Sequence, residues 1–307
     1  MELPLIIVLL ASLTKATHIL DLLPSFALNS KRIHSHNDYW REVPLYTALS
    51  YGVQSVEADV WNYPQLSQTE VFVGHHESSL TLERTLNSLY IDPLVDILQK
   101  ANPVNPFTNR SINHDVHATG SAANGVFDTN PKETLFLFID IKTNGYDTWK
   151  IVNQNLQKLR DLGYLTTFNG TSLVYSAVTV IGTGNTPFEY IQGINDRDIF
   201  FDGDLLALNE TMADGVTLKY NKSISPIAST SLKKAIGTVD ENGISKGQKM
   251  TLKTYIDQAH SLGIMVRIWD LEYWPVWKKF NIYKTLREIG CDFLNADDLQ
   301  WVSETMY

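Results

Sequence analysis

The sequence of 307 residues has one cysteine, no surplus of basic residues and one short apolar run near its start. The lone Cys291 excludes an internal disulfide and a zinc site built from several cysteines. Lys and Arg number 25 against 34 Asp and Glu, which gives a net charge of -9, and the basic residues are scattered. Because no basic stripe follows a phosphate backbone, nucleic acid is not an expected partner.

The apolar run at residues 3–13 is too short to cross a bilayer and has the length of the hydrophobic part of a signal peptide. Small residues at Thr14 and Ala16 permit cleavage, so residues 1–16 are predicted to be a signal peptide. Sequons for N-glycosylation begin at Asn109, Asn169, Asn209 and Asn221. We expect a secreted glycoprotein. A membrane anchor formed by the apolar segment, or a buried N-terminal helix, is the alternative.

The remaining chain alternates between apolar runs typical of buried strands and amphipathic runs typical of helices. Strands are expected at Arg32–His36, Ser55–Val60, Thr134–Ile141, Ser172–Val180, Asp198–Phe201, Gly215–Lys219, Met265–Trp269 and Asp292–Asn295. Helices are expected at Leu45–Tyr51, Leu94–Lys100, Thr148–Leu162, Leu252–Leu262 and Val276–Ile289, and the longest loop at residues 102–130. About eight such units favour an α/β fold, a closed (β/α)₈ TIM-type barrel forming one domain over residues 25–307. An open doubly wound sheet is the alternative.

Acidic and histidine side chains interrupt two neighbouring strands near their carboxyl ends. Glu57 and Asp59 alternate within an apolar strand, so both point toward whatever His36 faces at the end of the preceding strand. Buried carboxylates without a cation would remain unpaired, which is costly. The pattern therefore predicts a site for one oxygen-ligated divalent cation, Mg²⁺ or Ca²⁺, beside a histidine that moves protons.

More polar residues fall at the other predicted strand ends. Asp140 and Lys142 share a face, and His75 follows directly after a strand, where its side chain can reach the rim. His76 points away if that strand continues, so His75 is preferred, while His34 is preferred as a structural residue. Helix capping or turn formation is the preferred interpretation for Asp202, Asp204, Asp270, Asp297 and Asp298.

The order His36, Glu57-x-Asp59, Gly74-His75-His76 and Asp140-x-Lys142 resembles the phospholipase C-like phosphodiesterase superfamily. That superfamily includes glycerophosphodiester phosphodiesterases and sphingomyelinase D toxins. Within it, residues 35–39, 74–80 and 88–93 are similar to the fungal group named altered inheritance of mitochondria protein 6. The resemblance spans residue 30 to the C-terminus and implies a phospholipase C-like barrel.

The resemblance also implies roles for single residues. Glu57, Asp59 and Asp140 would bind the divalent cation, and His36 with one histidine of the second pair, preferably His75, would be the acid and base. Glycerophosphodiesterases usually have Arg after the first histidine and Glu at the third acidic position, where this chain has Asn37 and Asp140. The Asp140-x-Lys142 string is instead similar to sphingomyelinase D, and Lys142 is expected to contact the phosphate in place of the missing Arg.

These residues together predict a metal-dependent phosphoric diester hydrolase of lipid metabolism. Its expected substrate is a small-molecule or lipid phosphodiester, namely a glycerophosphodiester or a phospholipid headgroup. Peripheral contact of the protein with a membrane is compatible with such a substrate. Trp269 and Trp274 are better placed than the neighbouring aromatic residues to line a pocket for an apolar or choline-like group, with core packing as the alternative, and Trp277 is expected to pack in the core.

Two other functions are compatible with the same residues. His34-x-His36 also occurs in zinc amidohydrolase barrels, but no histidine lies between His117 and His260 to complete such a site. The second alternative is an inactive secreted barrel that binds a lipid headgroup or a sugar.

Overall fold

The computed structural model describes residues 29–103 and 123–307. The predicted signal peptide at residues 1–16, the sequon at Asn109 and most of the predicted loop at residues 102–130 lie outside the described residues. In the described part of the chain, no helix combines the length and the apolar character needed to span a membrane.

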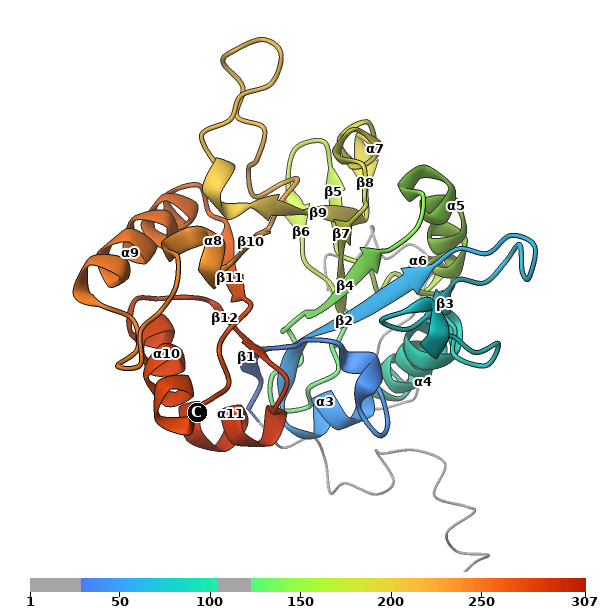
Figure 1. Ribbon diagram of the computed structural model, residues 1–307. Coiled ribbons are helices and arrows are strands. Elements are labelled where there is room, and N and C mark those ends of the chain that lie inside the picture. Colours follow the sequence, from blue (N-terminus) through green and yellow to red (C-terminus); the bar gives the residue numbers. More distant parts are fainter. Residues whose placement is uncertain (1–28, 104–122) are drawn as a thin grey trace, which may run out of the picture.

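Parallel strands close into a barrel, which confirms the predicted (β/α)₈ architecture (Figure 1). Around the ring they are β1 (Lys31–Ser35), β2 (Val53–Trp61), β4 (Leu135–Ile141), β7 (Val178–Gly184), β9 (Ile199–Asp204), β10 (Ile227–Ser231), β11 (Met265–Trp269) and β12 (Phe293–Ala296). The first strand, β1, closes the ring because His34 is in register with both Ser55 of β2 and Asn295 of β12. A short strand, β3 (Phe72–Val73), pairs antiparallel with the end of β2.

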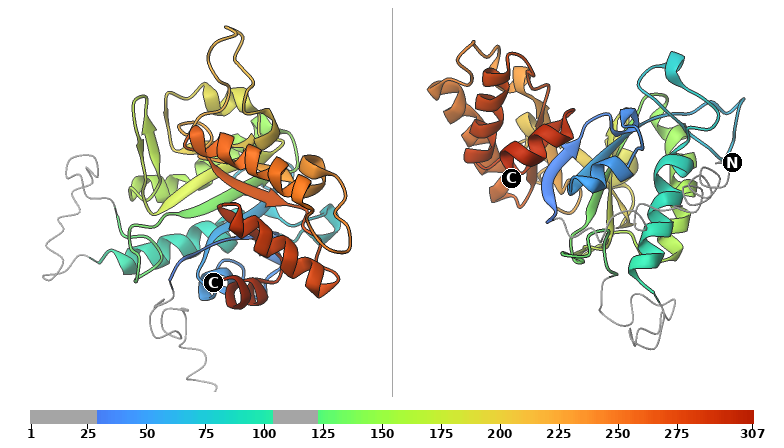
Figure 2. Two further views of the ribbon diagram at one scale, coloured as in Figure 1. Left: turned by 90° about the vertical axis from the view of Figure 1, so that its left-hand side faces the viewer. Right: turned by 90° about the horizontal axis from the view of Figure 1, so that it is seen from below.

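Helices surround the strands. They are α3 (Tyr46–Ser50), α4 (Asp92–Ala101), α5 (Gly145–Asn155), α6 (Gln157–Asp161), α7 (Phe188–Gln192), α8 (Leu232–Ile236), α9 (Lys246–Ser261), α10 (Val276–Glu288) and α11 (Leu299–Met306). Figure 2 shows the orange to red helices, α9 to α11, on one side of the strands and the teal α4 on the other. A second, small antiparallel sheet has β5 (Thr167–Asn169) at its centre, between β6 (Leu173–Val174) and β8 (Asp196–Arg197).

The alternation of side chains along each strand divides the core in two. In β4, Leu137 and Ile139 belong to the large apolar cluster, whereas Phe136 and Phe138 belong to a smaller cluster. This smaller cluster comprises Phe136, Phe138, Ile181, Phe200, Ile227 and Phe293, one or two residues from each of several barrel strands. Asp140 lies on the same face of β4 as Phe136 and Phe138, two residues closer to the carboxyl end of the strand, so its carboxylate follows directly after this smaller cluster.

Two predicted strands differ from the structure. The segment Gly215–Lys219 is not a strand but lies in the long loop between β9 and β10, at the top of Figure 1, with an isolated bridge between Thr211 and Leu218. The sixth barrel strand is β10 instead, which the sequence analysis missed. The predicted strand Ser172–Val180 is also displaced, because the barrel strand β7 runs from Val178 to Gly184.

Candidate active site

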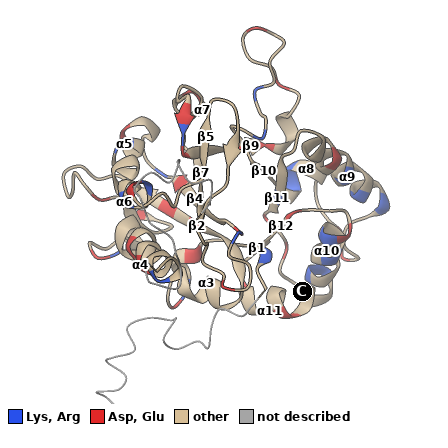
Figure 3. Ribbon diagram, turned by 180° about the vertical axis from the view of Figure 1, so that it is seen from behind, with Lys and Arg blue, Asp and Glu red and all other residues tan. Residues whose placement is uncertain are grey.

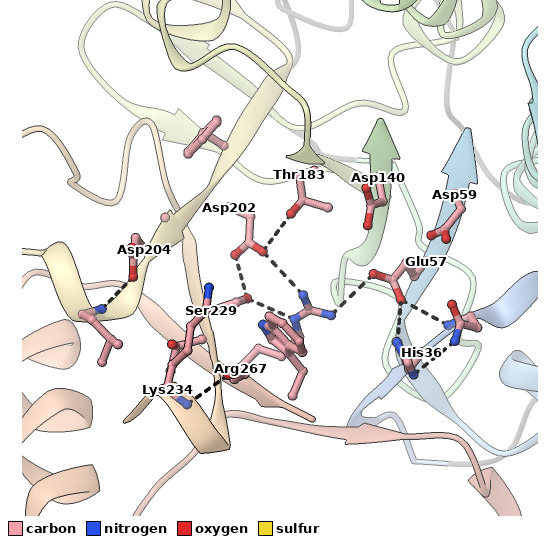
Figure 4. A pocket seen from close by; sticks show the side chains of 18 of the residues that line it. His36, Glu57, Asp59, Asp140, Thr183, Asp202, Asp204, Ser229, Lys234 and Arg267 are labelled. Atoms are coloured by element: carbon pink, nitrogen blue, oxygen red, sulfur yellow. Dashed lines mark hydrogen bonds and ion pairs between the residues drawn. The ribbon is translucent and has the colours of Figure 1, made fainter. Parts of the chain in front are cut away.

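The carboxyl ends of the strands enclose a cavity of about 620 Å³. The residues predicted to bind the cation or to act in catalysis all line this cavity, and they come from β2, from β4 and from the segments after β1, β3 and β4: His36, Glu57, Asp59, His75, Asp140 and Lys142. Figure 4 shows Glu57, Asp59 and His36 together at one side of the cavity, with Asp140 next to Asp59.

The three acidic side chains form one cluster. Asp59 and Asp140 are direct partners in the register of β2 with β4, and Glu57 lies two residues earlier on the same face of β2. One carboxylate oxygen from each of the three lies within 4.8 Å of the others. Oxygens that share one Ca²⁺ at roughly 2.4 Å each are separated by up to about 4.8 Å, so the cluster has the dimensions of a cation site.

Lys142 provides the positive charge nearest to this cluster. Its ammonium lies 3.0 Å from Asp59 Oδ2 and 2.9 Å from Asp140 Oδ2. Burial alone would lower the pKa of Lys142, but the carboxylates of Asp140 and Asp59 outweigh burial and raise it. Burial raises the pKa of Asp140 to about 6, although Lys142 opposes this shift. Asp59 Oδ1 is buried and forms no hydrogen bond with any described residue, so one carboxylate oxygen is free to bind a cation.

Glu57 is held by contacts with Asn37 and Arg267. Its Oε2 accepts a hydrogen bond from the backbone N–H of Asn37 at 3.1 Å, and its Oε1 lies 3.8 Å from the Arg267 guanidinium. Asn37 has a left-handed backbone (φ 49°), a conformation that Asn tolerates better than most residues. Burial would raise the pKa of Glu57, but the hydrogen bonds and positive charges around this carboxylate, Arg267 among them, outweigh burial and hold the pKa well below its usual range.

His36 lies at the mouth of the cavity and forms a pair with an aspartate. Its Nδ1 is 2.8 Å from Asp297 Oδ1, and its Nε2 is 3.9 Å from Glu57 Oε2. Burial opposes a charged imidazole, but the hydrogen bond to Asp297 and the charge of Glu57 outweigh burial and raise the pKa of His36. A carboxylate on Nδ1 leaves Nε2 available to exchange a proton inside the cavity.

His75 contacts the acid cluster from another direction. Its Nδ1 lies 3.4 Å from Asp59 Oδ2 and 3.2 Å from the Tyr39 hydroxyl. Partial burial, and then the positive charges of His76 and Lys142, lower the pKa of His75. His76 is exposed and is not among the residues that line the cavity. The geometry thus places His75, and not His76, next to the carboxylates.

Arg267 is a site residue that the sequence analysis did not single out. It is buried within β11 and donates to His34 Nε2 at 2.7 Å and to Ser229 Oγ at 3.0 Å. Arginine cannot accept a hydrogen bond, so His34 must accept at Nε2 and carry its proton on Nδ1, 2.7 Å from Ser55 Oγ. Burial and the charge of Arg267 lower the pKa of His34 to about 3, in agreement with a neutral ring. An arginine inside the apolar string Met265–Trp269 was the available signal.

Tyr39 and Asp297 were also not predicted for the site. The Tyr39 hydroxyl lies 2.8 Å from Asp59 Oδ2, and the Tyr39 side chain is almost fully buried. Asp297 was expected to be a cap or turn residue, but it pairs with His36. Nothing in the local sequence distinguishes Asp297 from the neighbouring Asp298.

The other strand-end aspartates divide between capping and the cavity. Asp204 and Asp298 are helix caps, as expected, because they accept hydrogen bonds from the backbone N–H groups of Leu206 and Trp301, and Asp204 also lines the cavity. Asp270 adopts a positive φ of 60°, in agreement with a turn. Asp202 differs from the expectation, because it is buried in the cavity wall between Ser229, Thr183 and Arg267.

The aromatic residues after β11 are arranged differently from the expectation. Trp269 lines the cavity, as predicted, but Trp274 is 70% exposed and is not part of the cavity lining. Trp277 is 62% exposed, so the expectation that it packs in the core is wrong. It begins an exposed face of α10 together with Val276.

Comparison with known proteins identifies the class of this barrel. Residues 25–202 match the family model described as the AIM6-like phosphodiesterase domain. The chain is 42% identical over 277 residues to the altered inheritance of mitochondria protein 6 homolog of Arthroderma benhamiae, an alignment that covers 87% of this chain and 81% of the relative. The chain therefore belongs to the AIM6 family, which confirms the resemblance found in its motifs.

Other relatives extend the comparison. The chain is 33% identical over 296 residues to altered inheritance of mitochondria protein 6 of Saccharomyces cerevisiae strain S288c, covering 89% of this chain and 70% of the relative. A solved glycerophosphodiester phosphodiesterase from Parabacteroides distasonis aligns with 91% of this chain and 98% of its own, with a TM-score of 0.49 and 11% identity.

Proposed function

We propose that this chain is a cation-dependent phosphodiesterase that cleaves a glycerophosphodiester or a phospholipid headgroup. One observation carries the proposal: a cluster of three carboxylates lies in one cavity with two histidines and a lysine. The AIM6-like phosphodiesterase domain supports the same class of reaction.

The residues present fit one divalent cation. Glu57, Asp59 and Asp140 would hold it, because carboxylate oxygens are the ligands that Mg²⁺ and Ca²⁺ prefer, and Asp59 Oδ1 is buried without a hydrogen bond from the part of the chain that the structure describes. When bound, such a cation neutralises and orients the anionic phosphodiester. Lys142 adds a positive charge on the same side of the cavity.

The histidines supply the two proton transfers of the proposed reaction. Asp297 fixes the ring of His36 and stabilises its charged form, so His36 accepts the proton of the attacking hydroxyl at Nε2. His75 then donates a proton to the leaving oxygen, and its lowered pKa makes its charged form a stronger acid. The ammonium of Lys142 stabilises the charge that builds on the phosphoryl oxygens.

The zinc amidohydrolase alternative fits the geometry less well. Both ring nitrogens of His34 are within hydrogen-bonding distance of Ser55 and Arg267, so neither is free to bind a metal. The candidate metal group found among the described residues contains carboxylates alone. Metal content measured by mass spectrometry after mild purification separates these functions, because bound zinc would favour the amidohydrolase.

Metal binding tests the proposed site independently of substrate. Isothermal titration of Mg²⁺ or Ca²⁺ into the full chain should show one binding site, which Glu57→Gln and Asp59→Asn abolish while circular dichroism keeps the native spectrum. Asp298→Asn is the matched control, because it removes an acidic side chain that caps α11 outside the cluster. Binding and turnover that persist in both cluster variants would refute the proposal.

We also propose secretion and contact with a membrane. The three sequons that lie in the described chain, at Asn169, Asn209 and Asn221, are exposed. Trp274 and Trp277 lie on the loop and helix that follow β11, and such exposed rings favour membrane interfaces. A mass decrease on enzymatic deglycosylation tests the first proposal. Sedimentation with phosphatidylcholine vesicles, lost in Trp274→Ser with Trp277→Ser, tests the second.

A further inference from the structure

The cavity is much larger than the acid cluster, and its far wall has a charge of its own. The barrel order places β10 four strands from β2 in either direction, directly across the ring. Residues at the end of β10 and in the first turn of α8 line the cavity there, among them Thr230, Ser231 and Lys234. Figure 4 shows Lys234 on the side of Ser229 and Asp204, away from Glu57 and His36.

Lys234 differs from the other Lys and Arg side chains that line the described cavity. Lys142 is compensated by Asp59 and Asp140, and Arg267 lies 3.5 Å from Asp202 and 3.8 Å from Glu57. Lys234 forms no ion pair with any residue that the structure describes. Its ammonium is therefore a cation with three hydrogen-bond donors available to a ligand in the cavity.

Lys234 lies on α8, one of the helices that carry basic residues. Figure 3 shows such residues on α8, α9 and α10 and acidic residues on β2 and β4, although Lys249, Lys253, Lys278 and Lys279 of α9 and α10 are paired with acidic side chains. Asp204 is an opposing charge on the same wall, but its Oδ1 already accepts the N–H of Leu206 at 2.9 Å. The hydroxyl of Ser231 accepts the backbone N–H of Lys234, which fixes the start of α8 at the cavity wall.

We propose that Lys234, with the neighbouring Thr230 and Ser231, forms an anion subsite for a second phosphate or carboxylate group on the substrate. This inference rests on the proposed function, because it assumes that the phosphodiester itself lies at the acid cluster. The cavity of about 620 Å³ has room for both groups and a short spacer. The preferred substrate is then a phosphodiester whose alcohol carries another negative charge, and a choline ester is disfavoured.

A matched pair of compounds tests the subsite. Glycerophosphoglycerol and its terminal phosphate monoester differ in one anionic group at the end of a three-carbon arm. Lys234→Met should raise the KM of the phosphorylated compound by about ten-fold, the size of one charge-assisted contact, and leave its kcat and the KM of the plain compound unchanged. Lys233→Met is the control, because Lys233 is exposed next to Lys234 but does not line the cavity.

Asp204→Asn gives a test of opposite sign, because asparagine keeps the cap and removes the opposing charge. It should lower the KM of the phosphorylated compound. Equal effects of Lys234→Met on both compounds, or the same effect from Lys233→Met, would overturn the subsite. Competition by inorganic phosphate that depends on Lys234, without any preference between the two compounds, would also overturn it and indicate a site for a free anion.

Calorimetric binding to the His75→Ala protein, loaded with Mg²⁺, separates this inference from the proposed function. A binding preference for the phosphorylated compound that Lys234→Met removes would support the subsite even if the unaltered protein cleaved neither compound. Cleavage of both compounds without such a preference would refute the subsite and leave the proposed function intact.

Discussion

At the scale of single residues, one substitution can distinguish a catalytic from a structural role of Lys142. It lies between Asp59 and Asp140, so it either stabilises the reacting phosphate or merely neutralises the two acids. Lys142→Met should lower kcat by about 10²–10³, the usual effect of removing one such charge, while metal affinity stays equal or rises. A normal kcat with a lower melting temperature would assign Lys142 a structural role.

The choice of substrate can distinguish the roles proposed for the two histidines, His36 as the base and His75 as the acid. His36→Ala and His75→Ala should each reduce turnover of an unactivated phosphodiester by about 10²–10⁴. A p-nitrophenyl ester needs no proton on its leaving group, so it should restore turnover in His75→Ala but not in His36→Ala. The opposite rescue would exchange the two roles. His76→Ala is the control, and its inactivity beside an active His75→Ala would show that the wrong histidine was chosen.

The residues predicted from sequence are those whose position follows from a strand. Glu57, Asp59 and Asp140 share faces with buried side chains, so their direction could be inferred from the alternation alone. Arg267 and Asp297 could not be placed in this way, because their partners His34 and His36 are 233 and 261 residues away. Only the ring of strands brings Arg267 of β11 against His34 of β1, and the segment after β12 against the segment after β1.

At the scale of elements, Arg267 links β11 to β2 and β9 through its contacts with Glu57 and Asp202. Arg267→Met leaves two buried carboxylates without their cation, so it should lower the free energy of unfolding by about 3–5 kcal/mol. Adding Asp202→Asn should recover part of this loss, because one unpaired charge is removed. Urea denaturation measures the free energy of unfolding of both variants. Lys253→Met is the control: it removes an exposed ion pair with Asp257, so it should lower this free energy by less than about 1 kcal/mol. An equal loss in Arg267→Met and this control would contradict the account.

Cys291, two residues before the start of β12, provides a pH-dependent test of the closed barrel. Burial raises the pKa of its thiol to about 12, whereas an unfolded thiol has a pKa of about 8.5. The folded chain thus keeps a proton that the unfolded chain releases, so this stabilising contribution is lost as the pH rises above about 8.5. Ellman's reagent should not react at pH 8 until the chain unfolds, and Cys291→Ala should flatten the fall in stability between pH 8 and 10. Rapid reaction with the native protein would contradict this burial.

The missed strand β10 and the wrongly predicted strand Gly215–Lys219 are both explained by side-chain hydrogen bonds. The strand β10 has the sequence Ile-Ala-Ser-Thr-Ser, whose hydroxyls resemble a loop, but Ser229 is satisfied by Asp202 and Arg267 inside the barrel. The segment Gly215–Lys219 has the composition of a strand, but Asp214 accepts hydrogen bonds from Val216 and Thr217 and forms a turn there. Neither set of contacts could be inferred from the residue composition of the segment alone.

At the scale of the whole molecule, the repeat of strand and helix predicted a parallel sheet with helices on its faces, and about eight such units favoured the closed barrel over an open doubly wound sheet. The far wall of the cavity was not predicted, since it is formed by the missed strand β10 and by α8. The extent of the domain, residues 25–307, stays a prediction.

The most direct test of the account follows the phosphorus atom itself. We expect ³¹P NMR of the full chain with a glycerophosphodiester and Mg²⁺ or Ca²⁺ to show a new monoester or cyclic phosphate resonance. Excess chelator should stop its growth, renewed addition of the cation should restore it, and Asp59→Asn should not produce it. Product formation that continues unchanged in chelator, or in Asp59→Asn, would contradict the claim that the three carboxylates hold a catalytic cation.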